Sequence, residues 1–275
     1  MSGGPLGPRY ARLDPSQVGR CFDGGAGSYD ETVWRNQAGA TRLIASVPEG
    51  PYERVVDVGC GTGFASEAVV QRFGPRSITG VDLSAAMLER FRARLGAAPG
   101  LAVDTREADV LDMSIDDGSV DLVVSTMAFH WFPDRAGALR SMSATLRPGG
   151  VLGILTGCDG TEEEYRQVVR SLSPAVPAAL VDIYDGLVGL EEMDTLIRGA
   201  GLEPTDVWIE RRRRVSSPDR IVARMRLVAG HLIGDLPEEE QERIWDRIGR
   251  ALAASCDEQP FVYHFHKLYA TARKP

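Results

Sequence analysis

Three glycines alternate with other residues directly after a short apolar run that contains one acid. The run is Arg54–Val58, its acid is Asp57, and the glycines are Gly59, Gly61 and Gly63. The run predicts a buried parallel strand, and the residues after the glycines have the apolar spacing of a helix. Glycine lets a ligand approach the main chain, and the N-terminus of a helix offers unpaired N–H groups. The stretch therefore predicts a turn that binds the polar part of a nucleotide-like ligand.

Two other glycine-rich signatures differ from this one. A dinucleotide-binding turn reads G-x-G-x-x-G, and Phe64 stands where its last glycine would fall. A phosphate-binding P-loop needs a lysine after its last glycine, and the sequence has none at this place. An acid two residues before the first glycine would repel a pyrophosphate but suits a cationic amino group. The turn therefore favours a ligand that carries an amino group.

Strand and helix patterns alternate after the glycine turn. Strands are expected at 76–82, 101–108, 120–125 and 151–155, and helices at 84–95 and 134–146. Alternation at this spacing predicts a doubly wound α/β sheet. Ligands of such sheets bind beyond the carboxyl ends of the strands, so the residues that follow each strand are the candidates for chemistry.

Two acids stand at such strand ends. Asp82 lies about 20 residues beyond the glycines, where an acid can accept hydrogen bonds from both ribose hydroxyls. Leu83 and Met87 would then flank an adenine as apolar walls. The alternative is that Asp82 is only a helix-flanking acid. Asp109 follows the third strand, and its alternative is a turn acid.

The end of the fourth strand is aromatic and contains one imidazole. Met127, His130, Trp131 and Phe132 fall in this segment. A histidine here could hold the nucleophilic group of a substrate or remove its proton, because imidazole titrates near neutral pH. The alternative is a packed histidine at the entry of a helix. The segment therefore predicts the side of the site that contacts the substrate.

These segments resemble the class I S-adenosyl-L-methionine (SAM)-dependent methyltransferases, whose first motif is close to hh[DE]hGxGxG. The resemblance covers roughly residues 50–157, with four segments in the right order. The Asn/Asp-Pro-Pro-aromatic motif of enzymes that methylate base or glutamine amines does not occur after the fourth strand. The segment looks like the small-molecule branch instead, including the trans-aconitate and ubiquinone-pathway types. Leu146-Arg147-Pro148-Gly149-Gly150, in which Arg147–Gly150 are expected as a turn, is also typical of that branch.

The resemblance implies a cofactor, a reaction and a set of site residues. The cofactor is SAM, and the reaction is in-line displacement of its methyl group by a small-molecule acceptor. His130 is the implied catalytic residue, and Trp131 and Phe132 are the implied acceptor contacts. The implied cofactor contacts are Tyr29, Asp57, Gly59, Cys60, Gly61, Gly63, Asp82, Leu83, Met87, Asp109, Val110 and Met127.

The resemblance also implies a domain plan. A Rossmann-like seven-stranded sheet with its last strand antiparallel is expected to form the core. Residues 1–48 are expected to be an N-terminal segment with a lid helix, and 49–215 the SAM-binding core. Members of the family end with a hairpin of strands six and seven, and this sequence departs from that pattern. Residues 216–258 are expected to be a helical cap inserted between the two strands, and 259–275 the final core strand.

Composition bounds the partners and the compartment. The 275 residues carry a net charge of −8, so general attraction to nucleic acid or to an anionic membrane is not expected. No apolar run approaches the roughly 18–20 residues of a membrane span, and the first residues lack a signal pattern. The four cysteines form no C-x-x-C pair, so free thiols in a reducing cytoplasm are expected, with neither disulfides nor a metal site. The oligomeric state is left open.

A few features fit more than one function. The run Arg211–Arg214 could bind an anionic substrate, but a charge run is more often a solvated face. His264 and His266 share one face of a strand and lack a nearby third metal ligand. The sequence is rich in arginine, alanine and glycine and poor in lysine, which fits a GC-rich coding sequence. This composition and the extra cap suggest specialised, natural-product metabolism. A SAM-fold binding or regulatory protein without methyl transfer is the alternative function, and a NAD-dependent oxidoreductase is disfavoured by the form of the glycine turn.

Overall fold

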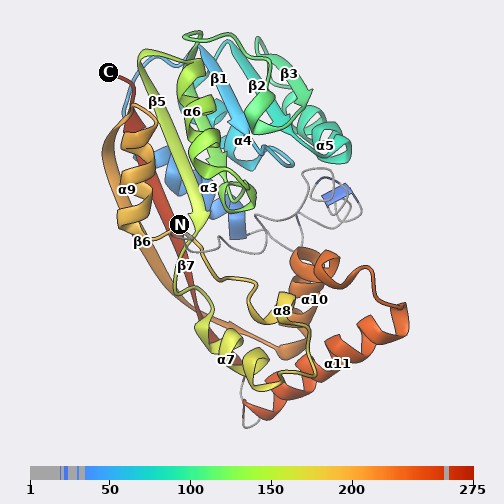
Figure 1. The fold of residues 1–275 in the computed structure, drawn as a ribbon. Helices are drawn as coiled ribbons and strands as arrows, with labels where there is room; N and C mark the ends of the chain where they lie inside the picture. The colour runs from blue at the N-terminus through green and yellow to red at the C-terminus, as the bar shows by residue number, and fades with distance from the viewer. Residues whose placement is uncertain (1–18, 20–21, 24–29, 31–34, 257–259) are drawn as a thin grey trace. The chain divides into compact units, whose positions relative to one another are not determined.

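The computed structural model describes residues 19, 22–23, 30, 35–256 and 260–275. Its contacts divide the chain into two compact units. Among the described residues, the larger unit comprises those up to Gly157 together with Val188–Ile209 and Leu268–Pro275, and the smaller unit comprises Cys158–Leu187 and those between Glu210 and Lys267. Tyr29 and the start of the expected lid helix lie outside the described residues. Figure 1 draws the elements of both units in chain order from blue to red.

A seven-stranded sheet runs in the order β3-β2-β1-β4-β5-β7-β6. The pairs β1–β2, β1–β4, β2–β3 and β4–β5 are parallel, and the last strand is antiparallel. The strand order reverses between β1 and β4, which is where ligands bind in doubly wound sheets. The predicted fold class is confirmed. The strands are β1 Arg54–Val58, β2 Ser77–Asp82, β3 Ala102–Glu107, β4 Val120–Thr126, β5 Leu146–Gly157, β6 Glu203–Ser216 and β7 Phe261–Arg273.

The helices of the larger unit begin and end at recognisable capping residues. The Ser84 hydroxyl accepts from the N–H of Met87, and Asp134 caps the helix that follows it. Gly201, at φ 75°, lies just beyond the last of these helices. Glycine reaches this conformation without the strain that a side chain would bring. The helices are α3 Arg35–Ser46, α4 Phe64–Phe73, α5 Ala85–Leu95, α6 Arg135–Thr145 and α9 Leu190–Gly199, with the short turns η2 Val110–Asp112 and η3 Phe129–Trp131.

The core of the larger unit lies between the central strands and the helices that cover them. Ile78 and Leu122 are fully buried in β2 and β4, and they pack in one cluster with Val69 of α4 and Phe91 of α5. Strands buried on both faces read as continuous apolar runs, which is why β4 carries Leu122, Val123 and Val124 in succession. This packing fixes the strand ends at one edge of the sheet, where the next residues can meet.

The segment Leu146–Gly150 is the first part of β5, so the expected turn is wrong. Gly149 donates its N–H to the carbonyl of Lys274 at 2.8 Å, and Lys274 donates back to the carbonyl of Gly150 at 2.9 Å. The Lys274 ammonium also donates to the carbonyl of Leu146 at 2.7 Å. The end of the chain therefore supplies the backbone partners that hold this Pro-Gly-Gly segment in a bulged strand. A local sequence pattern contains no sign of those distant partners.

The smaller unit is built around a buried ion pair. Glu162 is fully buried, and its carboxylate meets the Arg224 guanidinium through two contacts of 2.6 and 2.8 Å. The Tyr184 hydroxyl donates to the same carboxylate at 3.0 Å. Glu162 has a φ of 53°, a conformation that costs a non-glycine residue free energy. The helices of this unit are α7 Glu163–Ser171, α8 Ala178–Val181, α10 Pro218–Ala229 and α11 Glu238–Ala254, with the turn η4 Gly230–Ile233.

Removing the cation of this pair should destabilise the smaller unit. Arg224→Leu leaves the Glu162 carboxylate buried without its charged partner, which typically costs about 3–5 kcal/mol. Arg243→Leu is the matched control, because Arg243 and Glu239 form an exposed pair one helical turn apart. Such pairs contribute about 0.3–0.5 kcal/mol. Urea unfolding of both variants measures the difference, and equal losses would show that the buried pair does not stabilise the unit.

Candidate functional site

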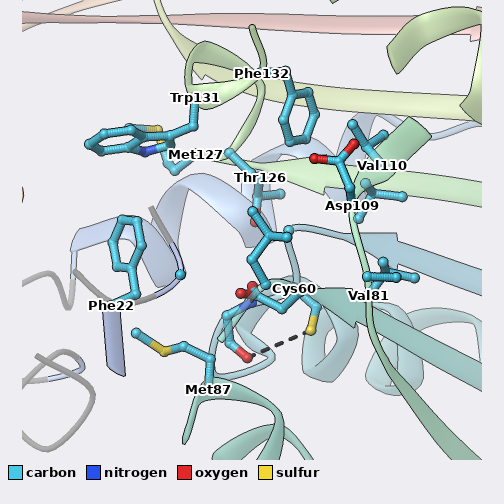
Figure 2. Close-up of a pocket in the computed structure, with 18 of the residues that line it drawn as sticks. Phe22, Cys60, Val81, Met87, Asp109, Val110, Thr126, Met127, Trp131 and Phe132 are labelled. Carbon is cyan, nitrogen blue, oxygen red and sulfur yellow. Dashed lines mark hydrogen bonds between the residues drawn. The ribbon is translucent and has the colours of Figure 1, made fainter. Parts of the chain in front are cut away.

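One cleft in the larger unit is bordered by the residues that follow β1, β2, β3 and β4. The doubly wound topology places these strand ends at one edge of the sheet. In Figure 2, Phe22, Met127 and Trp131 lie on one side of the cleft, and Asp109 and Val110 lie on the other. The lining residues are Gly19, Phe22, Asn36, Val58, Gly59, Cys60, Gly61, Thr62, Phe64, Val81, Asp82, Leu83, Met87, Ala108, Asp109, Val110, Thr126, Met127, Ala128, Trp131, Phe132 and Pro133.

The glycine turn needs its glycines for two different reasons. Gly59, at φ 65°, is so close to the segment after β4 that a Cβ there would stand 2.2 Å from the Cβ of Ala128. Gly61, at φ 51°, has open space where its side chain would be, and it lines the cleft. Gly63, at φ 92°, starts α4 and is not among the lining residues. The turn therefore packs against the sheet on one side and exposes its backbone to the cleft on the other.

Asp82 holds the glycine turn from the end of β2. One carboxylate oxygen accepts from the N–H of Gly61 at 2.8 Å, and the other accepts from the N–H of Ser84 at 3.0 Å. Burial raises the pKa of Asp82, and these two N–H groups oppose that rise. A carboxylate has about four acceptor positions, so two remain for hydroxyl donors in the cleft. The residues present thus fit a ligand with a vicinal diol beside the turn.

Apolar side chains form the wall next to Asp82. Leu83 and Met87 line the cleft from the start of α5, and Val110 faces it from the beginning of η2. Asp109 lines the same wall, and its carboxylate also accepts from the N–H of Leu111 at 2.8 Å. Asp109 therefore caps a turn and also borders the cleft, and its contact with a ligand stays a prediction. A flat heteroaromatic ring fits between apolar walls with one polar group at its edge.

Asp57 lies beneath the glycine turn and is not among the residues that line the cleft. The Ser66 hydroxyl, on α4, donates to one oxygen of its carboxylate at 2.7 Å. The other oxygen has no hydrogen-bond partner among the described residues. Burial raises the pKa of Asp57 to about 7. Asp57 thus supports the start of α4, and direct contact with a ligand stays a prediction.

Aromatic side chains form the opposite wall. The rings of Phe22 and Trp131 meet edge to face with centroids 5.4 Å apart. Met127 has a φ of 56° and donates its N–H to the carbonyl of Leu155 at 2.7 Å. Backbone strain of this kind gathers at functional sites, where the surrounding structure holds it. The strained residue turns the chain from β4 into the aromatic segment at the cleft.

His130 is held by the sheet and is not among the residues that line the cleft. Its Nδ1 lies 3.1 Å from the hydroxyl of Thr156, and its ring lies 5.5 Å from that of Trp131. Burial and the nearby Arg135 lower the pKa of His130 to about 3. Its imidazole is therefore neutral at pH 7 and a weak base. Its influence on the cleft passes through Trp131, the next residue.

Sequence reasoning missed the lining residues that come from outside the strand ends. Gly19 packs so closely that a Cβ would stand 2.7 Å from the carbonyl oxygen of Leu83. Phe22, Asn36 and Thr62 also line the cleft. An isolated aromatic within a glycine-rich stretch was the only signal for Phe22. The N-terminal residues thus contribute more of the site than the single contact expected at Tyr29.

The described residues contain no group of three His, Cys, Asp or Glu side chains that could hold a metal ion. None of the described helices is long and apolar enough to span a membrane.

Comparison with known proteins adds relatives over part of the chain. A family described as a methyltransferase domain matches residues 55–150. The trans-aconitate 2-methyltransferase of Deinococcus radiodurans is 34% identical over 170 residues, which cover 54% of this chain and 63% of that protein. The malonyl-[acyl-carrier protein] O-methyltransferase of Magnetococcus marinus is 40% identical over 132 residues, which cover 47% of each. The chain thus spans less than two thirds of either relative.

Solved structures share the fold across more of the chain. The [4+2]-cyclase SpnF matches with a TM-score of 0.61 and 21% identity, over 100% of this chain and 99% of that one. Phosphoethanolamine N-methyltransferase 2 of Haemonchus contortus, solved with SAM, matches with a TM-score of 0.53 and 19% identity, over 92% of this chain and 57% of that one. At these identities the likeness shows the fold alone.

Asp57 should make the stability of the protein depend on pH. Its folded-state pKa of about 7 lies above the usual value of 3.8, so folding retains a proton that the unfolded chain loses. Stability should therefore fall as the pH rises from about 4 to 7, by at most about 1.4 kcal/mol per pH unit. Asp57→Asn should remove this slope in urea unfolding measured from pH 4.5 to 8.5.

Ser66→Ala is the control for that prediction. The Ser66 hydroxyl stabilises the ionised carboxylate, so its loss should raise the pKa of Asp57 further and extend the slope to higher pH. Parallel stability profiles for the wild type and Asp57→Asn would contradict the account of Asp57.

Proposed function

Residues 55–150 are a methyltransferase domain on the class I fold of SAM-dependent methyltransferases, and from this premise we propose that the protein methylates a small-molecule acceptor. One observation carries the proposal. The cleft at the carboxyl ends of β1–β4 combines an open glycine turn, a strand-end carboxylate and an apolar slot. Each part suits a different part of SAM.

Different elements at the border of the cleft bind different parts of the cofactor. The Asp82 carboxylate accepts from the ribose hydroxyls, and the exposed backbone at Gly61 receives the methionine end. Leu83, Met87 and Val110 enclose the adenine, with Asp109 at its amino edge. When bound, SAM supplies a methyl group on a sulfonium centre that is already a good electrophile. The protein then has to orient the acceptor and exclude water, and the wall with Phe22 and Trp131 suits that task.

We infer that the acceptor is a carboxylic acid. The substrates given in the names of the trans-aconitate and malonyl-[acyl-carrier protein] enzymes both carry carboxylic acid groups. A carboxylate is ionised at neutral pH, so it attacks a methyl group without a general base. This agrees with a His130 whose pKa is lowered to about 3, because such an imidazole removes protons poorly. His130 then acts by fixing the aromatic segment, with its Nδ1 beside the Thr156 hydroxyl at 3.1 Å.

Several finer expectations stay predictions. The names of the relatives favour simple organic acids over the natural-product acceptors expected from composition. A cytoplasmic location and a cap over the acceptor formed by residues 216–258 are likewise proposals.

A second function, SAM binding without methyl transfer, is favoured by one observation. The chain shares its fold over its whole length with a protein described as a [4+2]-cyclase. Fold alone therefore leaves the reaction open. Turnover, rather than binding, separates the two functions.

Asp82→Ala should weaken SAM binding. Hydrogen bonds to a charged group contribute about 1.5–3 kcal/mol, so the dissociation constant should rise about 10-fold to 150-fold. Asp104→Ala is the control, because Asp104 is an exposed acid on β3 outside the cleft. Titration calorimetry measures both variants. Unchanged affinity in Asp82→Ala would exclude Asp82 as the ribose contact.

Methyl transfer to carboxylic acids tests the function itself. The protein is incubated with SAM labelled on its methyl group and a panel of di- and tricarboxylic acids. The expected product is a methyl ester, which releases labelled methanol in base. His130→Ala should bind SAM as the wild type does and transfer the label more slowly. SAM binding without labelled product from acids, alcohols, amines or thiols would favour the binding protein.

A further inference from the structure

Arg94 joins the glycine turn to two helices and to the N-terminal segment. It lies in the last turn of α5, and its Nε donates to the carbonyl oxygen of Thr62 at 2.7 Å. One terminal nitrogen donates to the Glu67 carboxylate on α4 at 3.1 Å, and the other forms an ion pair with Asp30. The guanidinium also stands 4.5 Å from the ring centre of Phe64. A single half-buried cation thus contacts four separate groups around the turn.

Two charged side chains hold adjacent residues of the turn. Asp82, at the end of β2, accepts from the N–H of Gly61 at 2.8 Å. Arg94, the tenth residue of the helix that follows, donates to the carbonyl of Thr62. The Thr62 hydroxyl makes a third contact, donating to Asp30 at 2.6 Å. Asp82 thus accepts from the backbone N–H of one residue of the turn, and Arg94 donates to the backbone C=O of the next. The two side chains come from β2 and from the helix that follows it, α5.

We propose that Arg94 is a positioning residue that keeps the glycine turn in the conformation that binds the cofactor. Glycine loses more conformational freedom on ordering than any other residue, so a turn with Gly61 and Gly63 is costly to fix. Contacts that order it before binding remove that cost from the binding step. Arg94 is not among the residues that line the cleft, so it acts through Thr62. The identity of the ligand in this inference rests on the proposed function.

The fork of the guanidinium is what this position requires. Arg presents several N–H donors in a fixed plane, and here they point at a carbonyl and two carboxylates. Lysine would bring one mobile charge and could not satisfy the three acceptors in the same directions. The ion pairs of Arg94 stay partly accessible to solvent, which weakens them, so the contact with the turn should affect binding more than folding.

The test compares Arg94→Met and Arg94→Lys with Arg92→Met. Arg92 is the matched control, because it lies on the same helix and donates to the exposed Thr105 hydroxyl at 2.8 Å. SAM binding by calorimetry should weaken about tenfold in Arg94→Met, by analogy with the loss of one hydrogen bond to a charged group. Arg94→Lys should restore only part of it. With saturating SAM and a working acceptor, kcat should stay near that of the wild type while KM for SAM rises.

A second readout needs no ligand. Amide hydrogen exchange of the peptide covering Gly61–Gly63 should be faster in Arg94→Met and unchanged in Arg92→Met, in full-length protein without SAM. Exchange and SAM affinity equal to wild type in Arg94→Met would overturn the inference. Faster exchange in a protein whose wild type does not bind SAM would instead overturn the proposed function and retain the role of Arg94 in ordering the turn.

Discussion

The structure depends on one set of hydrogen bonds between neighbouring strands, which join the end of β2 to the turn after β1. The carbonyl of Val81 accepts from the N–H groups of Gly59 and Cys60, and the Asp82 carboxylate accepts from that of Gly61. Three consecutive donors of the turn are thus satisfied by two consecutive residues. This set of hydrogen bonds fixes the turn against the sheet and keeps a buried carboxylate at the mouth of the cleft, which is otherwise unfavourable.

The two walls of the cleft would contact a ligand through different kinds of interaction. The wall expected to hold the cofactor consists of backbone and acids placed by parallel strands, with an apolar slot between them. The opposite wall contains the aromatic rings of Phe22 and Trp131, and the strained backbone of Met127 lies just before the segment that holds Trp131. Hydrogen bonds specify a ligand by direction, whereas ring packing specifies it by shape. One arrangement can therefore keep a fixed donor of methyl groups while the acceptor side varies.

The fold and the strand-end wall of the cleft could be predicted because their sequence signals are local, and the binding of a cofactor at that wall stays a prediction. A glycine turn, an acid at a strand end and a helix cap at Ser84 each occupy a few consecutive residues. The rest depends on distant partners. Leu146–Gly150 becomes a strand because Lys274 pairs with it, and His130 turns toward Thr156 at the end of β5. Phe22 reaches the cleft across tertiary packing that no pattern near it records.

The most direct test of the central claim is a crystal structure of the protein with S-adenosylhomocysteine. The account predicts ligand density in the cleft bordered by β1–β4. Both ribose hydroxyls should bond to the Asp82 carboxylate while that carboxylate keeps its bond to the N–H of Gly61, and the adenine should lie between Met87 and Val110. Ligand bound elsewhere, or bound in this cleft with its ribose away from Asp82, would contradict the account.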